Sequence, residues 1–404
     1  MDVATLWQDA IASLAALSPE RRMVRLAEVP GTDPPAILRE LVHDAIPERF
    51  SGREAACEPF RFEVTVLSTS VELDLTPLLG HPIGLRLAGP SPRAWNGLCT
   101  RVGLTGSDGG LARYTLSIEP FTALLKLRRN ALIFQDLDVR GIVERVLDDY
   151  PLSSFRWKAT QSLPVRAITT QYREDDFSFL QRLLAEAGLA WHFEPDEDAP
   201  AGHTWVVRDR ETPFRDLGTL RFHRIDITEE DDAITEFRQR LQATSSSVLA
   251  GSWQTERLVA VTGQAEAGAG TCALPPLEVF AQPRAGRFAD PDQAQRHAGL
   301  QLDALRVARN VVTGAGSARS LAPGTSFTLG QHERFGGQSF VVLAVEHAAR
   351  NNFSGRMATL LAHLDPARDT GETDYRNRFA AVPLGTPIVP RERPPVRSAG
   401  PQTA

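Results

Sequence analysis

Apolar and polar residues alternate along several short segments between about residue 25 and residue 120, which is typical of β-strands with one buried face. In residues 60–66, Phe and Val occupy every second position, and Arg, Glu and Thr lie between them. Gly, Pro and Asp separate such segments, as at 107–110. This part of the chain therefore predicts an antiparallel sheet or barrel with one wet face. The alternating segments are 60–68, 83–87 and 113–119.

The middle of the chain changes to helical spacing. Apolar residues between 139 and 150 fall on one stripe, with Asp138 as the expected N-cap and Pro151 as the end of the helix. A second stripe runs through residues 177–187 and ends at Gly188, a residue suited to the left-handed conformation after a helix. A strand pair is expected next, over 191–195 and 203–209.

The acidic run Glu174–Asp176 has two interpretations. Paired carboxylates can perform acid–base chemistry. Carboxylates at the start of a helix can also accept hydrogen bonds from free backbone N–H groups and interact favourably with the helix dipole. Because the run stands at the start of the second predicted helix, we interpret it as a cap.

Strand character returns from about Leu220 and is interrupted by one more helix. That helix is expected to open at Asp290, because Pro291 suits a first helical position. Ala294, Ala298, Leu302 and Leu305 form its expected buried stripe, and strands should follow at 325–330 and 339–347. Beyond Asp365 the chain is rich in Pro, Arg and small residues, which is typical of an extended linker.

These patterns divide the chain into five regions. The first 20 residues have apolar side chains at helical spacing and no basic segment before them, so they predict an amphipathic helix and not a signal peptide. The predicted regions are a helical leader (1–24), a first β region (25–120), a helical α/β connecting domain (121–219), a second β region with one inserted helix (220–375) and a Pro-rich linker (376–404).

Composition excludes several classes of protein. The 404 residues are 42% hydrophobic and 23% charged, with a net charge of −6. An acidic balance argues against a nucleic-acid binder and against an anionic membrane surface as the main partner. No apolar run approaches the length of a membrane span. Three widely spaced cysteines offer neither a disulfide framework nor a CxxC metal site, and they fit a reducing cytosol.

The sequence lacks the usual motifs of catalysis. No zinc spacing, GxSxG nucleophile or phosphate-binding P-loop occurs, so we expect no metal, no cofactor and no catalytic residue. The run Glu229–Asp232 lacks the glycine and the spacing of a calcium loop and is interpreted as a solvated turn. His347 lies in a predicted strand, and we interpret it as a hydrogen-bonded core or rim residue. These observations favour assembly or binding.

Five motifs in register resemble the VgrG family of type VI secretion spike proteins. They run from a glycine-rich turn and a Pro-Phe strand start, through a Phe-Gln-Asp element and a Gln-Tyr…Phe-x-Phe…Arg-Leu-Leu helix, to a Pro-Gly turn and a Glu-His strand end. Phe121, Trp191-His192 and Ala56-Cys57 depart from the family pattern as packing changes. The signature residues, all structural, are Gly52, Glu54, Pro59, Phe60, Leu79, Gly80, Pro82, Phe134, Gln135, Asp136, Gln171, Tyr172, Phe177, Phe179, Arg182, Leu183, Leu184, Gly188, Pro323, Gly324 and His347.

The resemblance implies an α+β, mainly β fold with two antiparallel β-barrels, similar to those of Hcp and of phage hubs, joined by α/β elements. Residues 25–120 would form the first barrel and residues 220–375 the second barrel region. It further implies a homotrimer whose six barrels form a pseudo-six-fold ring that adapts the hexameric Hcp tube to a three-fold needle. Baseplate components, effectors and a tip protein are the other implied partners. The chain is expected to be made in the bacterial cytoplasm and secreted or injected, with the OB-fold and needle missing after residue 404.

Three alternatives share parts of this evidence. A hub of a contractile phage tail or tailocin would have the same fold and trimer. A cell-wall hydrolase would need a reactive site, which the motifs do not supply. A monomeric carbohydrate- or effector-binding β-protein would differ in its oligomeric state.

Overall fold

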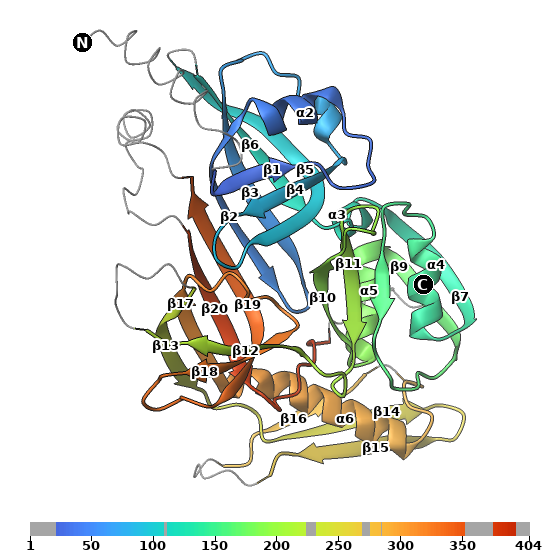
Figure 1. Ribbon diagram of the computed structural model, residues 1–404. Helices are drawn as coiled ribbons and strands as arrows, with labels where there is room; N and C mark the ends of the chain where they lie inside the picture. Colours follow the sequence, from blue (N-terminus) through green and yellow to red (C-terminus); the bar gives the residue numbers. More distant parts are fainter. Residues whose placement is uncertain are drawn as a thin grey trace.

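One large sheet dominates the computed structural model, which describes residues 22–108, 111–223, 232–268, 275–283, 285–351 and 375–392. Its first half has the strand order β1-β4-β5-β6-β3-β2, and every neighbouring pair in that half is antiparallel (Figure 1). The predicted alternating segments are all strands of this half. The bounds are β1 (Val24–Ala27), β2 (Ile46–Ala55), β3 (Glu58–Ser68), β4 (Pro82–Leu87), β5 (Arg93–Asp108) and β6 (Leu111–Glu119).

The second half continues the same sheet in the order β19-β20-β17-β13, and β18 and β12 join it beside β19. The two halves meet where β2 pairs antiparallel with β19. The bounds are β12 (Arg215–Arg221), β13 (Ile234–Leu241), β17 (Asn310–Gly316), β18 (Thr325–Gly330), β19 (Ser339–Arg350) and β20 (Tyr375–Pro383).

The expectation of two closed barrels is not confirmed, because no closed barrel occurs among the described strands. The period-two pattern identifies a strand and its buried face, but it does not identify the neighbouring strand. A closed barrel has no unpaired strand edge. In this protein, β2 and β19 satisfy each other's backbone groups across the two halves instead.

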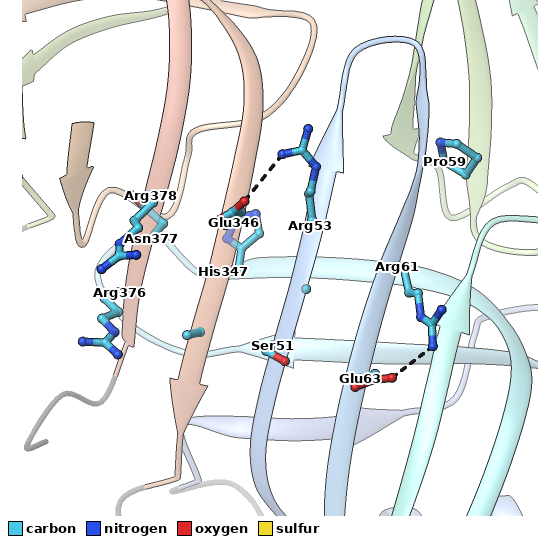
Figure 2. Close-up of a pocket in the computed structure, with 12 residues that line it drawn as sticks. Ser51, Arg53, Pro59, Arg61, Glu63, Glu346, His347, Arg376, Asn377 and Arg378 are labelled. Carbon is cyan, nitrogen blue, oxygen red and sulfur yellow. Dashed lines mark hydrogen bonds and ion pairs between the residues drawn. The ribbon is translucent and has the colours of Figure 1, made fainter. Parts of the chain in front are cut away.

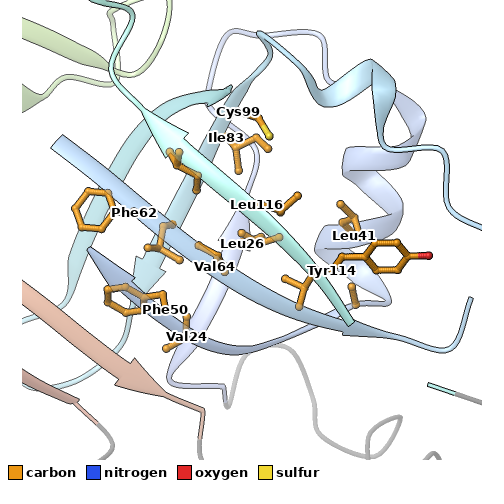
Figure 3. Close-up of a cluster of buried hydrophobic side chains, with 14 of the residues drawn as sticks. Val24, Leu26, Leu41, Phe50, Phe62, Val64, Ile83, Cys99, Tyr114 and Leu116 are labelled. Carbon is orange, nitrogen blue, oxygen red and sulfur yellow. The ribbon is translucent and has the colours of Figure 1, made fainter. Parts of the chain in front are cut away.

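Each half of the sheet buries its own core on one face. Phe62, Val64 and Leu116 are fully buried in the first core, which helix α2 (Ala36–His43) and the 3-10 turn η2 (Thr76–Leu78) cover (Figure 3). Phe327 and Phe379 belong to the core of the second half. The sequence pattern did not predict α2, because its eight residues are too few to show a helical period beside the surrounding strands.

The connecting unit is predicted correctly in its main elements. Helix α4 (Val139–Leu147) has Asp138 as its N-cap, with the side chain accepting from Gly141 N at 2.8 Å. Helix α5 (Asp176–Glu186) is followed by Gly188 at φ +70°. Trp191, Trp205 and Phe179 fill its core. The other bounds are α3 (Thr122–Leu125), β7 (Arg129–Leu137), β8 (Phe155–Trp157), β9 (Arg166–Asp175), β10 (Ala190–Pro195) and β11 (His203–Arg208).

A separate layer lies at the base of the molecule in Figure 1, where helix α6 (Pro291–Arg306) packs on a three-stranded sheet. Asp290 caps α6 by accepting from Gln293 N at 2.8 Å, and Ala294, Ala298 and Leu302 are buried as predicted. The sequence predicted this helix, but it did not predict the separate three-stranded sheet on which the helix packs. The remaining bounds are β14 (Ser247–Gln254), β15 (Val259–Glu266), β16 (Glu278–Ala281) and the 3-10 turn η3 (Val307–Arg309).

Three predicted boundaries differ from the structure. Residues 376–383 were assigned to the linker, but β20 occupies Tyr375–Pro383 between β19 and β17. Its buried residues are small or aromatic and are mixed with arginines, so its composition resembles a linker. β12 begins at Arg215, before the predicted boundary at 219. The leader up to Arg21 and residues 109–110 of the predicted turn lie outside the described residues, and β1 already begins at Val24.

A buried histidine lies inside the connecting unit, and its ring packs against Phe60 of the first half of the sheet, with ring centres 5.4 Å apart. His203 is 1% exposed, and its Nε2 accepts a hydrogen bond from Phe121 N at 3.0 Å. Its Nδ1 lies 2.9 Å from Ala201 O and donates to it. Because Nε2 faces an N–H group, a proton on that nitrogen would break the bond. Burial lowers the pKa of His203 to about 4.

This burial predicts acid sensitivity. The folded pKa of about 4 lies below the ordinary value of 6.5, so unfolded chains take up a proton as the pH falls below 6.5 while folded chains do not. The free energy of unfolding should drop by about 2 kcal/mol from this residue alone between about pH 7 and about pH 5. Urea unfolding at both pH values measures the drop. His203→Gln should make this drop smaller, and His43→Gln, at an exposed position, should leave it unchanged. Equal drops in the wild-type protein and both variants would contradict the assignment of the acid sensitivity to His203.

Candidate functional site

The seam between β2 and β19 brings together three signature residues that are distant in sequence. Gly52 is the register partner of His347, and Glu54 is the partner of Val345. A β-carbon at Gly52 would lie 2.1 Å from Cδ1 of Phe62, so only glycine fits at this position. The side of β2 that faces β3 is therefore too tight at this position for a methyl group.

His347 is the centre of a hydrogen-bonded network beneath the seam. Its Nε2 lies 2.9 Å from Glu54 Oε1, and its Nδ1 lies 2.8 Å from the Tyr375 hydroxyl. Asn377 Nδ2 donates to the Tyr375 oxygen at 3.1 Å and to Ala318 O at 2.8 Å. With a neutral ring, Nε2–H donates to the carboxylate and Nδ1 accepts from Tyr375. Both ring nitrogens are thus satisfied.

Two arginines extend this hydrogen-bonded network into the second half of the sheet. Arg93 of β5 donates to Glu54 and also to the backbone oxygens of Arg319 and Leu321, and its guanidinium lies 4.9 Å from the centre of the Trp95 ring. Arg319 donates to Asp232 and lies 5.0 Å from the centre of the Tyr375 ring.

The interpretation of residues 229–232 as a solvated turn is wrong for Asp232, the one member among the described residues. Its side chain is 9% exposed and pairs with Arg319. The sequence pattern could not show this, because the partner lies 87 positions away.

The charges of this network are fixed by its surroundings. Burial works against ionisation of Glu54, but the charge of Arg93 and the hydrogen bond from His347 outweigh it, so the pKa of Glu54 lies below its ordinary value. Burial lowers the pKa of His347 and raises the pKa of Tyr375 to about 12. The histidine is therefore neutral and the carboxylate ionised near neutral pH.

The network is sealed. The side chain of His347 is 0% exposed, and those of Glu54 and Arg93 are 10% and 11% exposed. A histidine between a carboxylate and a hydroxyl resembles part of a catalytic triad, but these atoms are closed off from solvent, and the Glu54 carboxylate, the His347 ring and the Tyr375 hydroxyl already bind one another. The interpretation of His347 as a hydrogen-bonded core or rim residue is confirmed, and the structure places it in the core.

The opposite face of the same strands forms a shallow charged hollow (Figure 2). It measures about 650 Å³, and a neighbouring hollow of about 340 Å³ shares part of its lining. We call this surface the arginine face. Its charged residues are Arg49 and Arg53 of β2, Arg61 and Glu63 of β3, Glu346 and Arg350 of β19, and Arg376 and Arg378 of β20.

A second group of signature residues lies within the connecting unit. Asp176 is fully buried and accepts from Arg128 Nε at 2.6 Å, from Tyr150 at 2.7 Å and from Gln171 Nε2 at 2.8 Å. Phe134 stacks on Phe179, with ring centres 5.4 Å apart. Phe177, Leu183 and Leu184 are buried in the same core. These residues hold α5 against the two-stranded antiparallel sheet of β7 and β9, which we call the β7–β9 ribbon.

The three acids of the predicted cap have different roles. Asp175 is the N-cap, because its side chain accepts from Ser178 N at 2.9 Å, as predicted. Glu174 instead pairs with Arg182, Oε1 to Nη2 at 2.5 Å, and Asp176 lies in the buried network described above. Asp175 is therefore the cap, and Asp176 lies in the first turn, where a carboxylate interacts favourably with the helix dipole; Glu174 has neither role.

The other signature residues shape turns and strands. Gly80 has φ +80° and donates to Cys99 O at 2.8 Å, and a β-carbon at Gly324 (φ +80°) would meet the His192 ring at 2.2 Å. Leu79 is exposed, and Phe60 is buried in the first core. Pro59 and Phe60 lie in β3, Pro82 begins β4, Gln135 and Asp136 lie in β7, Tyr172 lies in β9 and Pro323 precedes β18.

Sequence reasoning missed Arg93, Arg319, Tyr375 and Asn377. No local motif marks them, because their partners come from strands far apart in the chain. No group of three or more His, Cys, Asp or Glu side chains placed to hold a metal occurs in the described part of the chain. In that part, the helices are also too short or too polar to cross a membrane.

Comparisons with known proteins agree with this architecture. The sequence pattern of the phage tail baseplate hub (GPD) family matches residues 53–353. The type VI secretion spike proteins VgrG4b and VgrG5 of Pseudomonas aeruginosa are 30% and 29% identical over 90% and 91% of this chain. The chain spans 45% and 46% of their lengths, under half of each relative.

A solved structure shares the fold. The E. coli c3393 protein, described as a component of the type VI secretion system, superposes with a TM-score of 0.62 at 18% identity. The match covers 92% of this chain and 80% of that one. The resemblance to VgrG hub segments is therefore confirmed.

The buried network predicts a large difference between two glutamates on adjacent strands. Glu54→Ala removes the carboxylate from Arg93 and His347 and should lower the free energy of unfolding by about 3 kcal/mol. Glu63→Ala, on the exposed face, loses only an ion pair with Arg61 and should cost about 0.5 kcal/mol. Denaturant unfolding measures both values. A loss of equal size in the two variants would show that the buried network contributes no more to the free energy of unfolding than an exposed ion pair does.

Proposed function

This chain belongs to the phage tail baseplate hub (GPD) family, and we propose that it is the hub region of a type VI secretion spike. Its role is structural: it holds the parts of an injection machine in register and catalyses no reaction. The sealed seam network supports the second part of this proposal, because its titratable groups meet one another and no reactant. No described residues support the hydrolase alternative.

The observation that carries the proposal is the continuous sheet across β2 and β19. One chain thereby holds two sheet halves in a fixed relation. Three chains around an axis would present six halves, and such a pseudo-six-fold ring would fit a hexameric Hcp tube on one side and a three-fold needle on the other. A rigid seam suits this use, because force from a contracting sheath would be transmitted without separating the halves.

Exposed apolar residues support self-association. Ile133 and Ile168 are 66% and 60% exposed and lie on one face of the β7–β9 ribbon, at the edge of the molecule in Figure 1. Trp253 and Phe280 are 47% and 57% exposed on the sheet under α6. Apolar patches of this kind mark interaction surfaces on soluble proteins. We assign the ribbon to the contact between copies.

In this proposal the remaining partners are baseplate components, effectors, and the needle and tip protein, and the assembled spike is secreted or injected. A hub of a contractile phage tail or tailocin is the second candidate, favoured by the description of the matching family. Binding to Hcp distinguishes the two.

Mixed with Hcp tubes, the purified chain should form a complex of larger mass. Alone, it should give a mass of about three times 44.2 kDa in light scattering. Ile133→Glu combined with Ile168→Glu should reduce this mass to that of a monomer, because charges at an apolar contact are costly to bury. Leu104→Glu, an exposed residue of the first half, is the control and should leave the trimer intact. A wild-type monomer both alone and with Hcp would contradict the proposal.

A further inference from the structure

The arginine face carries a charge opposite to that of the whole chain. Six arginines and two glutamates line its two hollows, whereas the chain has 50 acidic and 44 basic residues. The charges lie in rows fixed by strand register: Arg378, Glu346, Arg53 and Arg61 occupy one row across β20, β19, β2 and β3. The positive charge is therefore concentrated over the seam.

The existing ion pairs on this face are weak enough to be exchanged. Arg53 pairs with Glu58 and Glu346, and Arg61 pairs with Glu63. In each pair both side chains are more than 40% exposed, and pairs in such solvent contribute little to stability. A partner's carboxylates can replace the local ones at small cost.

The shape of the face favours a long ligand over a compact one. Both hollows are shallow, and together they cross the strands β20, β19, β2 and β3 (Figure 2). Guanidinium groups bind carboxylates through two parallel hydrogen bonds. Single-stranded nucleic acids instead require aromatic rings on which bases can stack. The two aromatic rings in the lining, Phe50 and His347, are buried beneath the sheet.

We propose that the arginine face binds an acidic polypeptide segment, laid across the seam with its carboxylates on Arg376, Arg378 and the neighbouring arginines. This inference goes beyond the hub role, because a charged docking face functions on a trimer or on a monomer. Failure of the hub proposal would appear in the mass of the protein, and failure of this one would appear in binding.

The test uses the full chain and three fluorescent probes in anisotropy titrations at low salt. The probes are a glutamate-rich peptide, a lysine-rich peptide of the same length, and a single-stranded oligonucleotide with the same number of negative charges as the first. Variant R376E/R378E reverses two exposed charges of the face. Variant R145E/R296E reverses two exposed arginines on α4 and α6 and is the matched control.

The glutamate-rich peptide should bind the wild-type chain, and R376E/R378E should weaken binding by about tenfold or more, with about a twofold change at most in the control. R61Q/R378Q, which removes charge without adding repulsion, should show a smaller loss in the same direction. Thermal unfolding checks that each variant is folded.

Three results would overturn the proposal. The first is failure of the glutamate-rich peptide to bind the wild-type chain. The second is equal weakening in R376E/R378E and the control, which would mean that binding depends on net charge and not on this face. The third is tighter binding of the oligonucleotide than of the peptide, which would assign the face to nucleic acid.

Discussion

Strands β2 and β19 pair antiparallel from Ala55 and Ala344 to Arg49 and Arg350, and this pairing makes one sheet from the two halves of the chain. It satisfies backbone groups that would otherwise be exposed at two sheet edges. Beneath it, Glu54 and His347, 293 positions apart, share a hydrogen bond in a closed interior. Separating the halves would expose both edges and would break the bonds that cross the seam, from His347 to Glu54 and from Arg93 to the backbone oxygens of Arg319 and Leu321. The two halves are thus held as one body.

The alternation of a β-strand gives this seam two different faces. Gly52 and Glu54 point inward and make the sealed joint, whereas Arg53 between them points outward to the arginine face. The same holds on β20, where Tyr375 and Asn377 lie inside and Arg376 and Arg378 lie outside. A substitution on the outer face can therefore change binding without changing stability, and a substitution on the inner face can change stability without changing binding. This separation suits a structural hub, which needs a constant interior and an adaptable surface.

The sequence was sufficient for local structure and for the family, and insufficient for long-range pairing. The caps at Asp138, Asp175 and Asp290 and the turn at Gly188 depend on near neighbours, so their roles could be predicted. The partner of β2 is a strand from the other end of the chain, and no periodicity identifies it. Two barrels were expected from the family resemblance, and no local pattern could show that the described strands form one continuous sheet across β2 and β19 instead. Arg93 and Tyr375 were missed for the same reason, although His347 was placed correctly from the strand face it occupies.

Native-state hydrogen exchange of the backbone amides of β2 and β19 tests the central claim, that the seam makes the two halves one rigid sheet. If the seam is intact in the folded protein, its amides should exchange only through global unfolding, with the same free energy as the central strands β3 and β20. Seam amides that exchange at a clearly lower free energy than the strands on either side would show that the halves separate in the native state. That result would contradict the account.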